Sequence, residues 1–247
     1  MDPLLELRGV EQTFGRLVAL HPIDLSLRAG QITALLGDNG AGKSTLIKVI
    51  TGFHPPRRGQ LLYEGAPVRF TSPQQARDRG IEAVYQDLAL VPRCSIARNF
   101  FLGREPTRRP FGLLDLAAMN EGARRALGEI GIAIRDPQDP VETLSGGERQ
   151  AVAIGRAVYF GSRLLILDEP TSALSIGETR KVLGYMRQAR DRGLGVLFIT
   201  HNLHHVYEVA DHLVVLSHGR VVADAPRDQL IPEQTAELIM EGRLSPR

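Results

Sequence analysis

Short apolar runs alternate with amphipathic stretches along most of the chain. Five runs are almost continuously apolar, and each is short enough to be a buried strand: residues 32–36, 81–85, 164–167, 196–200 and 213–216. Strands that are apolar on both faces are typical of parallel sheets covered by helices. The pattern therefore predicts an α/β fold with a mostly parallel core sheet.

The first seventy residues follow another pattern. Apolar and polar residues alternate there in short segments, with Gly and Pro between them: 4–8, 18–20, 23–27, 61–63 and 68–70. Alternation with a period of two predicts strands that have one solvated face. We therefore expect an N-terminal antiparallel β subdomain beside the parallel sheet.

Helical spacing accounts for much of the remainder. Ser72 and Pro73 form a cap and first turn for a helix through Arg79. Apolar residues at helical spacing predict further helices over 115–130, 178–192 and 232–241.

A stretch rich in Pro, Gly and Arg (GREPTRRPFG, 103–112) indicates a surface loop within a mainly helical insertion. We expect one domain over 1–247, in which residues 1–90 and 161–225 form the core. Residues 91–160 form the helical subdomain, and 226–247 a C-terminal helix and tail.

Composition narrows the class of protein. The 247 residues include 30 Lys and Arg against 28 Asp and Glu, a net charge of +2, and 43% are hydrophobic. These values are typical of a globular chain and argue against binding nucleic acid through bulk charge. For the same reason we expect Arg104, Arg108 and Arg109 to be solvated loop residues.

A lone cysteine, Cys94, excludes an internal disulfide, favours a reducing compartment and is expected to be a small buried hydrophobe. The first residues lack the long apolar core of a signal peptide. No apolar run approaches the roughly 20 residues that span a bilayer. We therefore expect any work at a membrane to be that of a peripheral partner.

A phosphate loop follows the first buried strand. The run GDNGAGKS fits the pattern G-x-x-x-x-G-K-[ST] and opens a helix whose apolar face is expected to hold Leu46, Val49, Ile50 and Phe53. Its glycines let backbone N–H groups point at phosphate oxygens, beside the positive end of the helix. Lys43 adds a charge for the outer phosphates and Ser44 a hydroxyl for Mg²⁺. A plain Gly-rich turn would leave Lys43 and Ser44 unexplained. The predicted nucleotide-binding residues are Gly37, Asp38, Asn39, Gly40, Ala41, Gly42, Lys43, Ser44 and Thr45.

Two acids stand at the end of another buried strand. Asp168 and Glu169 follow residues 164–167, and ligands of open parallel sheets lie beyond the carboxyl ends of the strands. We expect Asp168 to hold Mg²⁺ and Glu169 to act as general base toward the attacking water. The alternative is two solvated acids at a strand end, and the presence of a phosphate loop makes that alternative less favoured.

A third motif, LSGGERQ at 144–150, precedes an apolar helix. Ser145 and Glu148 stand at capping-box spacing, so a well-capped helix is the simpler interpretation. However, Ser145, Gly146 and Gly147 also leave a bare, electropositive helix N-terminus that could meet a phosphate.

With this third motif, the chain resembles the ATP-binding cassette (ABC) ATPases from about residue 4 to 224. GDNGAGKS resembles their Walker A motif, LSGGERQ their signature and LLILDE their Walker B motif, and the three occur in the family's order. The resemblance implies a P-loop NTPase that binds ATP and Mg²⁺. It implies that Lys43 and Glu169 are catalytic and that Ser44 and Asp168 are metal ligands.

The resemblance assigns roles to further residues. Gln86 resembles the Q-loop glutamine, which senses Mg²⁺ and the attacking water and leads into the membrane-partner surface. His201 resembles the switch histidine that contacts the γ-phosphate; taken alone, it would be an ordinary strand-end histidine. Phe14 fits the aromatic that stacks on adenine, although tyrosine is more familiar there and a core Phe is the alternative. Ser175 departs from the family, because an aspartate is usual at that place in the D-loop.

The family also implies partners. ABC ATPases of this type sandwich ATP between the Walker A motif of one cassette and the signature of another, so we expect an ATP-dependent dimer, most simply a homodimer. The expected location is the cytoplasmic face of the bacterial inner membrane. A permease would contact the surface around residues 86–104, and a periplasmic solute-binding protein would deliver the solute. Phe100, Phe101 and Leu102 fit either the permease contact or the core of the helical insertion.

Residues 81–90, 96–105 and 202–211 resemble the ATPases of bacterial simple-sugar importers of the ribose and fructose class. This resemblance implies ATP hydrolysis coupled to sugar import. Other solutes (a nucleoside, a polyol or an amino acid) stay open, because the permease and the binding protein choose the solute. A non-transport ABC ATPase is a further alternative, but no charged heptad run is present. A nucleotide-binding regulator that does not hydrolyse ATP is another alternative, which the intact catalytic residues disfavour.

Overall fold

The protein was studied as a computed structural model that describes residues 2–108, 110–132 and 136–244. Arg109, one of the three expected loop arginines, therefore lies outside the described residues, as does the end of the expected tail. No helix in the described ranges is both long enough and apolar enough to cross a membrane.

A six-stranded sheet forms the centre of the molecule, in the order β12-β11-β3-β10-β9-β6. All neighbours run parallel except β11 and β12. The five expected core strands are all present with small changes at their ends, and β12 was not expected. Their bounds are Ile81–Val84 (β6), Ile32–Leu36 (β3), Leu164–Asp168 (β9), Gly195–Ile199 (β10), His212–Ser217 (β11) and Arg220–Pro226 (β12).

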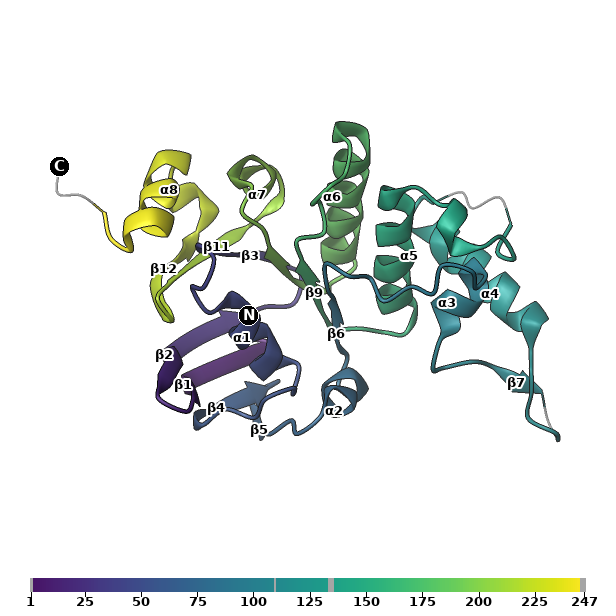
Figure 1. The fold of residues 1–247 in the computed structure, drawn as a ribbon, viewed down its shortest axis with the longest axis horizontal. Coiled ribbons are helices and arrows are strands. Elements are labelled where there is room, and N and C mark those ends of the chain that lie inside the picture. Colours follow the sequence, from purple (N-terminus) through teal and green to yellow (C-terminus); the bar gives the residue numbers. More distant parts are fainter. Residues whose placement is uncertain (1, 109, 133–135, 245–247) are drawn as a thin grey trace.

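An antiparallel sheet of order β2-β1-β4-β5 lies against one face of this sheet, with α1 (Lys43–Ile50) between them (Figure 1). One long strand replaces the two segments expected over 18–27, because Pro22 stands on an edge strand, where no ladder N–H is needed. The strand expected at 68–70 is wrong: it lies at 66–68, and Phe70 lies beyond its end, buried in the apolar core that α1 shares with the two sheets. The bounds are Leu5–Phe14 (β1), Leu17–Leu27 (β2), Arg58–Tyr63 (β4) and Ala66–Val68 (β5).

Helices cover the opposite face of the central sheet. Apolar side chains of α6, α7 and α8 pack there with the sheet and with the inner part of α5 (Gly146–Tyr159). The expected C-terminal helix has the predicted bounds, and the helix expected at 178–192 begins two residues earlier at a capping box. The bounds are Ile176–Asp191 (α6), Leu203–Val209 (α7) and Pro232–Glu241 (α8), with α2 (Pro73–Asp78) on the other side of β6.

A helical lobe with its own apolar core stands beside the sheet (Figure 1). It contains α3 (Ile96–Phe101), α4 (Leu116–Glu129) and most of α5 (Gly146–Tyr159), with the small hairpin β7 (Thr107–Arg108) and β8 (Leu113–Leu114) at its edge. Phe100 and Phe101 are 0% and 3% exposed in this core, whereas Leu102 is 50% exposed. The core interpretation is therefore right for the two phenylalanines, and a permease contact through them is wrong.

The predictions for Phe53, Cys94 and the loop arginines can also be compared with the structure. Phe53 does not share the face of α1, because the positive φ of Gly52 ends the helix and leaves Phe53 exposed. Cys94 is half-buried rather than fully buried. Arg108 pairs with Asp115 at 3.0 Å, and the Arg104 guanidinium lies 4.8 Å from the ring centre of Phe160. The domain boundaries at 90 and 160 stay a prediction.

Candidate functional site

The phosphate loop joins the end of β3 to the start of α1. Gly37 and Gly42 have φ of 148° and 107°, a region that L side chains rarely adopt. A Cβ on Gly37 would lie 2.2 Å from the Leu216 carbonyl oxygen, and one on Gly42 would lie 2.9 Å from that of Ala19. The loop therefore closes only because these positions carry no side chain.

A cavity of about 580 Å³ surrounds this loop. It brings together most of the residues that the sequence singled out: Phe14, Asn39, Gly40, Ala41, Gly42, Lys43, Ser44, Thr45, Gln86, Asp168 and Glu169. Thus the carboxyl ends of β3, β6 and β9 meet at one place, as the parallel pairing requires. Gly37 and Asp38 form the base of the loop, where both carbonyls accept from Lys43.

Lys43 is the cation of the cavity. Its Nζ donates to the carbonyl oxygens of Gly37 at 2.7 Å and Asp38 at 3.0 Å. Desolvation lowers the pKa of Lys43, while the charges of Glu169 and Asp168 oppose that shift. A partly desolvated ammonium beside a helix N-terminus is suited to hold phosphate oxygens.

Asp168 is the partly buried acid of the pair. Desolvation, followed by the charge of Glu169, raises the pKa of Asp168, and Lys43 counteracts both. Ser44, Gln86 and Asp168 give this cavity a hydroxyl, an amide and a carboxylate. Hard divalent cations such as Mg²⁺ prefer oxygen donors and are often held by few protein groups together with substrate phosphates. The donor set therefore fits Mg²⁺.

Glu169 has an unusual backbone. Its φ is 49°, in the left-handed region that non-glycine residues seldom occupy. Its N–H donates to the Ile199 carbonyl at 2.9 Å, and its own carbonyl accepts from the Ser172 N–H and Oγ. Three backbone contacts thus hold a strained residue whose side chain faces the cavity.

His201 follows β10 and reaches the same acid. Its Nδ1 lies 2.9 Å from Glu169 Oε1, and the imidazole is 80% exposed. Among the described residues, those that line the cavity include Glu169 but not His201 itself. The role of His201 toward a phosphate stays a prediction. Asn202 caps α7 directly after it, so the turn between β10 and α7 positions the imidazole.

The expected adenine-stacking residue, Phe14, ends β1. It is 43% exposed, lines the cavity and makes an edge contact with His54 at 5.3 Å between ring centres. It is therefore no core residue, although its role toward a base stays a prediction. His218 and Gly219, which the motifs did not point to, line the same cavity from the β11–β12 turn. Only the turn-like run Ser217–Arg220 between two apolar segments could have pointed there.

The signature residues lie elsewhere. Ser145 caps α5 through a capping box with Glu148, so the simpler interpretation of this motif is confirmed. Gly146 lines a second cavity of about 420 Å³, between the segment after β6, the start of α5 and the loop before α6. Gln86 lines both cavities. Within one chain, therefore, Ser145, Gly146 and Gly147 do not join the phosphate loop.

Sequence and structure comparisons agree on the class of protein. Residues 20–172 match the family described as ABC transporter. The xylose/arabinose import ATP-binding protein XylG of Sulfolobus acidocaldarius is 48% identical over 97% of this chain and 94% of its own length. The fructose import ATP-binding protein FrcA of Rhizobium meliloti is 46% identical over 99% and 96%. A ribose import ATP-binding protein of Rubrobacter xylanophilus is 43% identical, and the chain spans 48% of its length.

Solved structures have the same fold. An ATP-binding cassette of an ABC transporter superposes with a TM-score of 0.85 at 25% identity, covering 98% of both chains. A dimeric bacterial ABC transporter cassette gives a TM-score of 0.73 at 21% identity, over 90% of this chain and 98% of the other. With a matching family, near full-length relatives and this fold, the chain belongs to the ABC transporter family, as one of its ATP-binding cassettes.

Proposed function

We propose that this chain is the ATP-hydrolysing subunit of a membrane importer for a simple sugar. One observation carries the ATPase part: Lys43, Asp168 and Glu169 line one cavity, and His201 bonds to Glu169. The sugar part is supported by the names of relatives, which are import proteins for xylose or arabinose, fructose and ribose.

ATP is the substrate of the proposed reaction. Lys43 and the N-terminus of α1 hold its outer phosphates, and the exposed ring of Phe14 stacks on the base. Ser44, Gln86 and Asp168 would hold Mg²⁺, which when bound neutralises phosphate charge and orients the phosphates for in-line attack. Glu169 accepts the proton of the attacking water, and His201 positions Glu169 and the γ-phosphate.

Pairing of two copies completes the proposed site. The phosphate loop and the signature of one chain lie in separate places, so Ser145, Gly146 and Gly147 serve the nucleotide of a second copy. A bacterial ABC transporter cassette with the same fold is dimeric. We therefore propose an ATP-dependent homodimer in which each copy supplies half of two sites.

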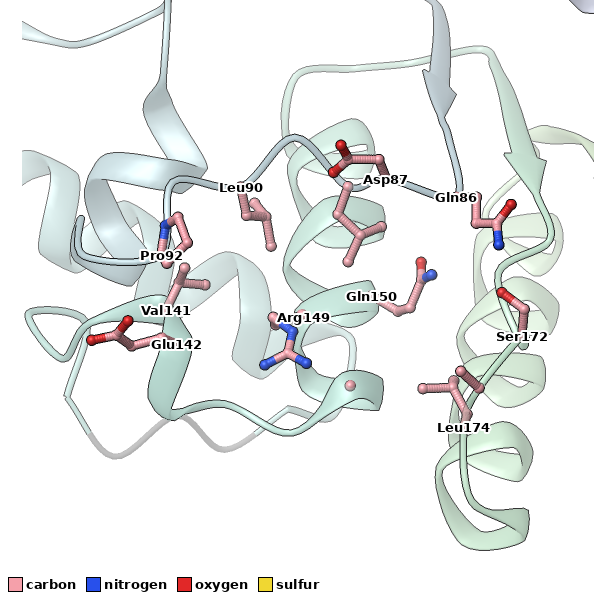
Figure 2. A pocket seen from close by; sticks show the side chains of 13 residues that line it. Gln86, Asp87, Leu90, Pro92, Val141, Glu142, Arg149, Gln150, Ser172 and Leu174 are labelled. Atoms are coloured by element: carbon pink, nitrogen blue, oxygen red, sulfur yellow. The ribbon is translucent and has the colours of Figure 1, made fainter.

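The second cavity is the proposed seat of the permease (Figure 2). Figure 2 shows the side chains of Gln86, Gln150 and Ser172 facing one space between the segment after β6 and the start of α5. Because Gln86 lines both cavities, a partner segment seated here would touch a residue that also faces the nucleotide. This route is proposed to link ATP binding to the permease, at the cytoplasmic face of the inner membrane. A periplasmic solute-binding protein would deliver the sugar, and no nucleic acid is needed.

The test combines hydrolysis with partner capture. The purified chain should release phosphate from ATP only with Mg²⁺, and Glu169→Gln should dimerise by light scattering at saturating ATP and Mg²⁺. A permease encoded beside this gene should co-purify and stimulate the ATPase when its binding protein carries sugar. ATP binding without phosphate release would refute the proposed ATPase activity. A stimulating solute other than a sugar would refute the proposed cargo.

A further inference from the structure

Glu178 binds two helix N-termini at once. In the first turn of α6, its Oε2 accepts from the Ser175 N–H at 3.0 Å and from Ser175 Oγ at 2.8 Å, which forms the capping box of this helix. Its other oxygen, Oε1, accepts from the Gly147 N–H at 3.2 Å, in the first turn of α5. One carboxylate therefore connects the start of α6 to the signature helix.

The glycines of the signature make this contact possible. A Cβ on Gly147 would lie 3.0 Å from Glu178 Cβ, and one on Gly146 would lie 2.6 Å from Leu174 Cδ2. Figure 2 shows Leu174 beside the start of α5. The start of α6 and the loop before it thus pack closely against the start of α5, and a side chain on Gly146 or Gly147 would require Leu174 or Glu178 to shift.

The Glu178 carboxylate is a well-bound anion. Ser175, the Gly147 N–H and the hydroxyl of Ser145 all hold the pKa of Glu178 down, to about 2. The group is therefore ionised at any pH near neutrality. It accepts from the Gly147 N–H, the kind of donor that a helix N-terminus offers to phosphate.

We propose that Glu178 is an internal stand-in for phosphate, which occupies Ser145 and Gly147 until the γ-phosphate of the partner's ATP displaces it. This inference rests on the proposed pairing of two cassettes. Two anions cannot share the one Gly147 N–H, and their like charges repel at close range. The displaced carboxylate keeps its bonds to Ser175, so α6 stays capped while its link to α5 is broken.

Removing the charge should therefore make pairing easier. Glu178→Gln keeps the capping box, because Gln serves at that position as well as Glu. In a Glu169→Gln background, we expect the ATP concentration that gives half-maximal dimer by light scattering to fall by about fivefold, since no anion competes. Glu233→Gln is the matched control: it removes the same charge from the exposed first turn of α8 and should leave that concentration unchanged.

The outcomes separate this inference from the proposed function. An unchanged or raised ATP requirement in Glu178→Gln, while Glu169→Gln pairs normally, overturns the stand-in role alone. Failure of Glu169→Gln to pair at saturating ATP and Mg²⁺ overturns the pairing and this inference with it. As a second readout on the unpaired subunit, Glu178→Ala should speed amide hydrogen exchange at Gly147. Unchanged exchange there also contradicts the proposal.

Discussion

His201 Nδ1 lies 2.9 Å from Glu169 Oε1, although the two residues follow different strands of the central sheet. The pairing of β9 with β10 places Asp168 opposite Ile199, so the segments that follow these strands leave the sheet side by side. The contact is therefore a consequence of strand order, and it ties an exposed imidazole to a strained, partly buried acid.

The first prediction concerns the acid of this pair. Glu169→Gln removes the proposed base but keeps a side-chain oxygen near His201, so the site should bind ATP almost unchanged. We expect phosphate release to fall by about 100-fold or more, the usual contribution of a general base. Single-turnover phosphate release and equilibrium nucleotide binding check this. His201→Ala should reduce release while leaving Glu169 in place, and a Glu169→Gln variant with full activity would remove Glu169 from its role.

The second prediction concerns Asp168 and pH. Because the pKa of Asp168 is raised in the folded chain, its favourable contribution to folding is present below its ordinary pKa of 3.8. That contribution is lost as pH rises through the raised value. Asp168→Asn should therefore be more stable than the wild type at neutral pH, and the difference should shrink in acid.

Denaturant unfolding at several pH values, without nucleotide, measures this difference. Phosphate release should fall in the same variant, because Asn lacks the charge that suits Mg²⁺. An Asn variant that is less stable at neutral pH would contradict the desolvation argument.

The third prediction compares two glycines of the phosphate loop. Gly37→Ala would place a Cβ 2.2 Å from the Leu216 carbonyl, whereas a Cβ at Gly40 meets nothing within 4 Å. We expect Gly37→Ala to cost about 2–4 kcal/mol of stability through overpacking. Gly40→Ala, at a φ of 82°, should cost about 1 kcal/mol through backbone strain alone. Thermal unfolding of both variants measures the difference. Equal losses of stability would show that the close approach of Gly37 to the Leu216 carbonyl in β11 is unimportant.

The sequence predicts this site better than its surroundings for physical reasons. Lys43, Asp168 and Glu169 are fixed by strand ends and a glycine loop, and these leave local signals in the chain. Phe70 misled the strand assignment because it is buried in the apolar core although it lies beyond the end of β5, so its burial does not come from strand alternation. The hydrogen bond from Gly147 to Glu178 joins two helices whose relative position depends on tertiary packing, so no local sequence pattern predicts it. His218 likewise enters the cavity only through the pairing of β11 with β3.

The last prediction concerns Gln150, which is 6% exposed and lines the second cavity. Among the described residues, the Gln150 Oε1 is the buried side-chain polar atom that has no hydrogen-bond partner. An unmade bond of this kind costs about 1–3 kcal/mol. Gln150→Met, of similar volume, should therefore leave the isolated subunit as stable as before or more stable.

Gln12 provides the matched control. It is also buried, but its Oε1 accepts from the Arg57 N–H at 3.1 Å, a group that donates to the Glu11 carbonyl at 2.9 Å as well. Gln12→Met should therefore lose the modest stability that this shared hydrogen bond contributes. If the free acceptor of Gln150 awaits a donor from the permease, Gln150→Met should lower permease-stimulated ATPase while sparing basal phosphate release. Denaturant unfolding and reconstituted ATPase assays measure the two effects. A destabilised Gln150→Met with normal stimulation would mean that Gln150 serves the fold and not the partner.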